Sequence, residues 1–288
     1  MTSAALWAQG ARPRTLGAAV SPVLVGTAVT SRPGEVIWWR ALFCLLLALA
    51  LQVGVNYAND YSDGVKGVDT QRRGPVRLTA SGLAAPAAVR RAAVLSFAVG
   101  GLLGIVLAVA VDWRLILVGS ASILAAALYS GGPKPYASSG LGEVMVLVFF
   151  GFVATCGSAY VQLERVPWLA VAAAVPVGLL ACAILLVNNL RDVDSDREVG
   201  KRTLAVRVGR ARTKQLYRAA VVLAMLAPVA LAPTAPGALL AVAAAPLAVP
   251  PLRIVATRTD PPALVRALIA TARLQLILSV LLAAGLAL

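Results

Sequence analysis

Long apolar segments separated by short polar ones run through almost the whole chain. A helix needs about 20 apolar residues to cross the hydrocarbon core of a bilayer. Division of the chain at its polar, proline and glycine clusters predicts spans at residues 15–31, 38–60, 88–111, 113–130, 141–162, 167–189, 215–233, 236–256 and 264–286. The pattern therefore predicts an all-α integral membrane protein, a bundle of nine transmembrane helices.

The composition supports a lipid environment for most of the chain. Hydrophobic residues make up 60% of the sequence and charged residues 13%, whereas soluble domains carry about 25% charged residues. The chain has no histidine, which excludes histidine-based catalysis and histidine metal sites. No linker rich in serine or glycine interrupts the sequence, so we expect residues 1–288 to form a single domain.

The distribution of basic residues predicts the orientation. The formal net charge is +14, and most lysines and arginines fall in the segments that lie on the same side as the N-terminus. By the positive-inside rule this side is cytoplasmic, in the cell's inner (plasma) membrane. Little water-facing surface remains for a basic stripe, so we expect no nucleic-acid partner.

Most of the acidic residues fall in two clusters, each at the inner end of a predicted span. The first contains Asp60, Asp63 and Asp69, and the second contains Asp192, Asp194, Asp196 and Glu198. Each cluster begins with the pattern Asn-x-x-x-Asp, at Asn56–Asp60 and at Asn188–Asp192. Residues four apart share a helix face, so each pattern predicts a ladder of oxygen ligands.

Carboxylates at the end of a membrane span need a counter-charge. A charged side chain in the bilayer is costly, and like charges one turn apart repel. Mg²⁺ prefers oxygen ligands and commonly binds one or two carboxylates together with substrate phosphates. Two facing clusters would suit Mg²⁺ around a diphosphate, with the metal ligands Asn56, Asp60, Asp63, Asp192 and Asp196. The simpler alternative is that these acids pair with loop arginines.

Basic residues near the clusters are candidates for direct contact with a diphosphate, on which negative charge develops as its ester bond breaks. The candidates are Arg72, Arg73, Arg191, Lys201 and Arg202. Each of them also fits the simpler role of a positive-inside marker. Lys134 lies between Gly132–Pro133 and Pro135, which restrict the backbone, and we predict that it is catalytic together with the aspartates of the two ladders.

Five segments resemble the UbiA superfamily of intramembrane prenyltransferases, most closely its branch that acts on 1,4-dihydroxy-2-naphthoate. They are ARPRTLGAAVSPVLVGTA (11–28), NDYSDGVKGVD (59–69), RRGPVRLTASGL (72–83), YSGGPKPYASSGLGE (129–143) and NNLRDVDSDREVGKRTLAVRVG (188–209). The resemblance implies a central cavity open to lipid and covered by cytoplasmic cap loops. It also implies Mg²⁺ as cofactor and transfer of a polyprenyl group from polyprenyl diphosphate to the naphthoate with decarboxylation, a step of menaquinone biosynthesis that gives demethylmenaquinone.

Several assignments stay open at this stage. The first motif departs from the superfamily spacing Asn-x-x-x-Asp-x-x-x-Asp, because Gly64 occupies the final position, so either Asp63 or Asp69 is its second ligand. Arg14 is a candidate for the acceptor carboxylate, although a topology marker is the simpler role. Arg273, within the last span, either faces the cavity or extends to the interface. Four aromatic residues are candidates for stabilising an allylic cation: Tyr129, Tyr136, Phe149 and Phe150.

Two other functions fit parts of the pattern. A prenyltransferase for another aromatic acceptor, such as 4-hydroxybenzoate, would share the aspartate motifs. An ion-coupled transporter would also place acids within the membrane, but inverted repeats are typical of that class. Here both Asn-x-x-x-Asp patterns run from outside to inside, which favours the enzyme. The sequence does not indicate an oligomeric state.

Overall fold

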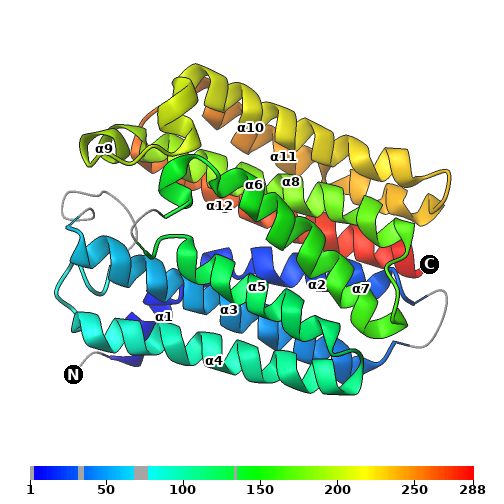
Figure 1. Cartoon of the computed structure of the whole chain (residues 1–288). Coiled ribbons are helices and arrows are strands. Elements are labelled where there is room, and N and C mark those ends of the chain that lie inside the picture. The colour runs from blue at the N-terminus through cyan, green and yellow to red at the C-terminus, as the bar shows by residue number, and fades with distance from the viewer. Residues whose placement is uncertain (1–2, 32–35, 68–76, 133–134) are drawn as a thin grey trace.

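The computed structural model describes residues 3–31, 36–67, 77–132 and 135–288, and these ranges contain helices and turns but no strand. The long helices lie side by side with nearly parallel axes, and the two termini lie at opposite ends of the bundle (Figure 1). The prediction of an all-α protein is therefore confirmed.

Seven helical segments in the described ranges are long and apolar enough to cross a membrane. They are α3 (Trp38–Val65), α4 (Pro86–Ala110), Gly142–Leu163, α8 (Trp168–Arg191), α10 (Leu204–Leu231), Pro236–Thr257 and α12 (Pro261–Ala287). The segment Gly142–Leu163 consists of α6 (Gly142–Val146), the π-helix η3 (Leu147–Val153) and α7 (Ala154–Leu163), and Pro236–Thr257 consists of η4 (Pro236–Ala244) and α11 (Ala245–Thr257). The chain is thus a multi-pass membrane protein.

The other two predicted spans form shorter helices. Helix α2 (Gly17–Ala28) has 12 residues and α5 (Arg114–Leu128) has 15. At a rise of about 1.5 Å per residue they reach roughly 18 and 22 Å, less than the hydrocarbon thickness of about 30 Å. Seven of the predicted spans are therefore present at full length, and the count of nine is not established by helix length.

Short helices that the apolar pattern did not predict flank the spans on the polar side. They are α1 (Ala4–Gly10), η1 (Pro13–Thr15), η2 (Ala137–Ser139) and α9 (Val193–Glu198). Two long helices also extend beyond their predicted bounds, because helical structure continues where the sequence becomes polar. Helix α3 runs through the first acidic cluster, and α10 begins well before residue 215 and is interrupted at Gly209, whose φ of 80° favours glycine.

Helix α8 forms the centre of the bundle. In its most apolar stretch 67% of residues are buried, against 22% for α4, which lies at the edge. Small residues allow close packing around α8: an added Cβ at Gly178 would lie 2.9 Å from Cα of Gly151 in η3 and 2.7 Å from a methyl group of Leu147. Such close backbone approaches are a major source of helix association in membranes, where lipid is as apolar as the side chains.

Exposed tryptophans mark one end of the bundle. Trp38, Trp113 and Trp168 lie at the beginnings of α3, α5 and α8 and are highly exposed, and these three helices begin at the same end of the bundle (Figure 1). Tryptophan favours the boundary between hydrocarbon and water. The three rings therefore fit one membrane interface, at the end opposite the acidic clusters.

Substitution Gly178→Ala tests the close approach of α8 and η3. The added methyl group forces the two backbones apart, so we expect the free energy of unfolding to fall by about 1–3 kcal/mol. Thermal loss of helical circular dichroism in detergent measures this change. The matched control is Gly157→Ala in α7, where an added Cβ meets no atom within 4 Å; equal melting temperatures for the two variants would contradict the packing argument.

Candidate active site

A cavity of about 960 Å³ runs along the bundle from the acidic clusters to the opposite end, where Val161 and Leu115 line it. Apolar side chains form most of its length, and polar side chains gather at the end that carries the acidic clusters. On one side the polar lining includes Arg12, Asn56, Asn59, Asp63, Lys66 and Arg77, and on the other it includes Asn188, Asn189, Asp192, Asp196 and Lys201. Both predicted clusters therefore contribute to one cavity.

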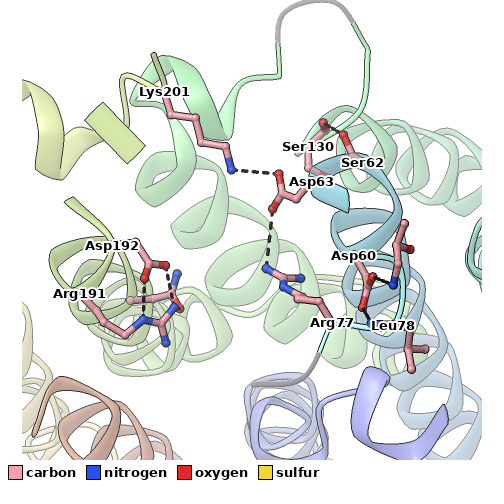
Figure 2. Close-up of polar contacts among 11 residues, drawn as sticks. Asp60, Ser62, Asp63, Arg77, Leu78, Ser130, Arg191, Asp192 and Lys201 are labelled. Atoms are coloured by element: carbon pink, nitrogen blue, oxygen red, sulfur yellow. Dashed lines mark hydrogen bonds and ion pairs between the residues drawn. The ribbon is translucent and has the colours of Figure 1, made fainter. Parts of the chain in front are cut away.

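Two carboxylates of helix α3, those of Asp60 and Asp63, point in different directions. Asp63 lines the cavity, whereas Asp60 is fully buried and accepts hydrogen bonds from the backbone N–H groups of Leu78 and Thr79 at 2.8 and 2.9 Å. Figure 2 shows Asp60 directed at this turn and Asp63 directed toward Lys201. The ligand role of Asp60 stays a prediction, and its observed contacts are structural.

Asn56 is also held by backbone near the N-terminus. Its side-chain amide donates to the carbonyl of Ala11 at 2.8 Å and to the hydroxyl of Thr15 at 3.2 Å. Sequence reasoning missed Asn59, which lies one turn further along α3 and lines the cavity with Asp63. The pair Asn59–Asp63 has the same spacing as Asn188–Asp192, and this repeated spacing is the sequence feature that could have identified Asn59.

Two basic side chains neutralise Asp63. Lys201 Nζ lies 2.9 Å from Asp63 Oδ1, and Arg77 Nη2 lies 3.7 Å from Oδ2 (Figure 2). Lys201 follows the second cluster, and its backbone N–H donates to the carbonyl of Asp196 at 2.8 Å. One residue therefore connects the two clusters across the polar end of the cavity.

The second cluster has its own basic partner. Arg191 donates to both carboxylate oxygens of Asp192, at 2.7 and 2.6 Å, and to the side-chain oxygen of Asn188 at 3.0 Å. All three side chains are placed by the last turn of α8. Asp196, on the short helix α9, is buried and lines the cavity. The predicted ladder Asn188–Asp192–Asp196 thus faces a single space.

The other predicted basic residues differ in position. Arg202 is exposed, and its backbone rather than its side chain makes the local contact, through a hydrogen bond to the carbonyl of Ser138. Arg72, Arg73 and Lys134 lie outside the described residues, as does Asp69. Their predicted roles stay predictions.

Four aromatic side chains contribute to the wall of the cavity. Tyr129, Tyr136, Phe149 and Phe150 all line it. The rings of Tyr129 and Tyr136 meet edge to face with centroids 5.5 Å apart, and Tyr136 donates to the carbonyl of Ala125. Electron-rich ring faces next to a charged site can stabilise a cation.

An arginine near the N-terminus has an unusual backbone conformation. Arg12 has φ 53° and ψ 68°, in the left-handed region, and it lines the cavity. Strained backbone of this kind persists where surrounding structure requires it, often at functional sites. Arg14 and Arg273 are exposed and do not line the cavity.

The arrangement suits an amphiphile with a polyanionic head. Carboxylate and amide oxygens alternate with lysine and arginine at one end, and a long apolar channel continues from there. In the described part of the chain, no three carboxylates or thiols cluster closely enough to form a metal site by themselves.

Comparison with known proteins gives concordant results. The model of the UbiA prenyltransferase family matches residues 19–276. The 1,4-dihydroxy-2-naphthoate octaprenyltransferase of Mycobacterium tuberculosis is 48% identical over 248 residues, which cover 86% of this chain and 85% of that protein. The enzyme of the same name from Escherichia coli is 37% identical, over 73% of this chain and 71% of that protein.

Solved structures with the same fold are more distant in sequence. A UbiA homolog from Archaeoglobus fulgidus, bound to DMAPP and Mg²⁺, superposes with a TM-score of 0.67 at 15% identity, over 96% of this chain and 98% of that one. A UbiA homolog from Aeropyrum pernix superposes with a TM-score of 0.69 at 15% identity, over 93% and 96%.

Substitution Asp60→Ala tests the structural role of this carboxylate. Loss of both acceptor oxygens leaves the N–H groups of Leu78 and Thr79 without partners, so we expect their amide hydrogen exchange to accelerate at least tenfold. Hydrogen exchange read by mass spectrometry on peptides that contain these residues measures the effect. The matched control is Asp63→Ala on the same helix, which should leave these two amides protected.

Proposed function

The chain belongs to the UbiA prenyltransferase family, and from this membership we propose that it transfers a polyprenyl group from polyprenyl diphosphate to 1,4-dihydroxy-2-naphthoate. The ring loses its carboxylate as CO₂, and the product is demethylmenaquinone in its reduced form. The observation that carries the proposal is the single cavity in which both acidic clusters meet at the head of an apolar channel. Relatives named for this reaction match most of the chain.

We propose that the same bundle crosses the membrane nine times as one domain. Helices α2 and α5 would complete the count, and the bundle's opposite termini agree with an odd number of crossings (Figure 1). The cationic end would face the cytoplasm across the plasma membrane, by the positive-inside rule. The segments next to the acidic clusters would form cytoplasmic cap loops, with the cavity open to lipid at its side.

Mg²⁺ fits the residues at the polar end. Hard cations bind carboxylate and amide oxygens, and Asp63, Asp192 and Asp196 line the cavity with Asn59 and Asn188. We assign these five residues to metal and diphosphate binding. The bound ion supplies positive charge that stabilises the departing diphosphate. Asn56 and Asp60 would support this set through their contacts with neighbouring backbone.

The basic side chains supply charge of their own. As the allylic C–O bond breaks, the electron pair leaves with the diphosphate, and Lys201 and Arg77 lie where they can contact its oxygens. Arg72, Arg73, Lys134, Arg191 and Arg202 remain proposed contributors. Preorganised cations of this kind act most strongly where water is excluded. The apolar walls exclude water that would otherwise capture the allylic cation.

The acceptor reacts beside the aromatic side chains. The ring carbon that carries the carboxylate attacks the allylic carbon, and the bond to the carboxylate then breaks, so its electron pair returns to the ring. No proton leaves the ring carbon in this sequence, and the step needs no general base. Tyr129, Phe149 and Phe150 flank this part of the cavity, where their ring faces would stabilise the cation.

Arg12 is our candidate for the acceptor's carboxylate. Arg12 lines the cavity, as does Tyr129, whereas Arg14 is exposed and does not line it. A guanidinium binds a carboxylate through two parallel hydrogen bonds. We therefore propose Arg12 for this role in place of Arg14, the candidate from the sequence.

A transfer assay tests the function. Purified protein in liposomes, with Mg²⁺ and radiolabelled polyprenyl diphosphate, should prenylate 1,4-dihydroxy-2-naphthoate, and EDTA should abolish the product. Asp63→Ala and Asp192→Ala should each reduce kcat at least about 100-fold, because each removes a carboxylate that would hold the Mg²⁺ ion whose positive charge stabilises the departing diphosphate. The control is Asp194→Ala, an exposed residue paired with Arg210. Prenylation of 4-hydroxybenzoate instead of the naphthoate would contradict the proposed acceptor.

Substitution Arg12→Gln tests acceptor recognition. Loss of the guanidinium should raise KM for the naphthoate about 30-fold, corresponding to about 2 kcal/mol for a charged hydrogen bond, and leave KM for the diphosphate unchanged. Steady-state kinetics with each substrate varied in turn measures both constants. Arg14→Gln should behave as wild type, and equal effects of the two variants would disprove the assignment.

A further inference from the structure

Glu143 is a buried acid that the reaction described above does not use. It lies in the first turn of α6, at the beginning of the span Gly142–Leu163, and its side chain is 7% exposed. Ionisable groups inside membrane spans are costly and are commonly retained for function. Glu143 itself does not line the cavity, although its neighbours Gly142 and Met145 do.

The side chain of Glu143 has one polar contact among the described residues. Its Oε1 accepts a hydrogen bond of 2.9 Å from Nδ2 of Asn189 on α8. Its other oxygen, Oε2, is buried and has no hydrogen-bond partner in that part of the chain. The carboxyl group therefore bridges α6 and α8 through the amide of Asn189 alone.

This contact determines what Asn189 offers to the cavity. Asn189 lines the cavity, and its NH₂ group is turned toward Glu143. A carboxyl Oε1 can accept this bond whether or not Oε2 carries a proton. The amide oxygen Oδ1, which can only accept a hydrogen bond, and the second N–H of the amide then remain for a ligand.

Asn189 lines the cavity next to Asn188, close to one helical turn before Asp192 on α8. It precedes Asp192 by three residues on α8, so it lies about 4.5 Å deeper along the helix axis than the carboxylate at the polar end. The reacting carbon of a prenyl diphosphate is likewise next to its polar head and deeper in the cavity. Arg12, Tyr129 and Asn189 line the same cavity.

We propose that Glu143 is a positioning residue for the acceptor: it holds the amide of Asn189 so that Oδ1 accepts a hydrogen bond from a ring hydroxyl of the naphthoate. This inference rests on the proposed function. The naphthoate carries two hydroxyl donors and one carboxylate, so Arg12 and Asn189 together would fix the orientation of the ring. An acceptor on the hydroxyl also increases electron density in the ring, which favours attack on an allylic cation.

A pair of variants at Glu143 distinguishes positioning from acid chemistry. Glu143→Leu removes the bond to Asn189, so KM for the naphthoate should rise about tenfold while KM for polyprenyl diphosphate stays within twofold. Glu143→Gln keeps an oxygen that can accept from Asn189, so both constants should stay within about twofold of wild type. Loss of activity in Glu143→Gln equal to that in Glu143→Leu would overturn the proposal, as would an unchanged KM in Glu143→Leu.

Acceptor analogues identify the hydroxyl and do not depend on the folding of Glu143→Leu. With wild type, one of the two mono-O-methyl ethers of the naphthoate should show a KM about tenfold above that of the parent compound. With Asn189→Ala, the KM for the parent compound should already be raised, and the same ether should add no further increase. Additive effects of methylation and Asn189→Ala would overturn the proposal. Absence of naphthoate transfer by wild type would instead refute the proposed function.

Discussion

Burial of a carboxylate among membrane-spanning helices costs much free energy unless a positive charge lies next to it. This requirement for a paired charge determines the arrangement of side chains at the polar end of the cavity. Asp63 forms ion pairs with Lys201 and Arg77. Nε and Nη2 of Arg191 donate hydrogen bonds to the two carboxylate oxygens of Asp192. Lys201 and Asp63 come from segments far apart in sequence, whereas Arg191 directly precedes Asp192. The pairing of Lys201 with Asp63 therefore draws α3 toward the segment that follows the second acidic cluster, and the three bases concentrate positive charge where a polyanionic head would bind.

The two aspartates of α3 show how one helix combines a structural and a chemical role. Asp60 accepts hydrogen bonds from the backbone N–H groups of Leu78 and Thr79 and so holds this turn in place. The turn directly follows Arg77, which is an ion-pair partner of Asp63. The buried carboxylate thus fixes the start of a segment that supplies charge to the cavity. A residue without access to the cavity can in this way influence chemistry within it.

The apolar pattern of the sequence predicted the class of fold and the position of seven full-length spans, because twenty apolar residues have few alternatives in lipid. It could not predict where α3 ends or where α10 begins, since the last turns of α3 and the first turns of α10 are polar. It also could not decide between Asn56–Asp60 and Asn59–Asp63. Both pairs have helical spacing, and their faces differ by about 60°, so the packing of α3 against its neighbours makes the choice.

Charge patterning located both acidic clusters and Lys201, but not the geometry that gives each residue its role. Arg12 and Arg14 are two residues apart, and the left-handed backbone of Arg12 directs one inward and leaves the other exposed. Glu143 gave no signal beyond being a single acid at the start of a span. Its importance follows from Asn189, 46 residues away, a contact that periodicity does not predict.

The length of the apolar channel affects how a donor substrate is held. Lipid chains and the channel wall are similar as solvents, so an isoprenoid tail that passes from one to the other gains little free energy per methylene. Tail length then contributes far less to affinity than it would for an enzyme that extracts its substrate from water. The head group must supply most of the binding energy, and long and short donors would compete on nearly equal terms.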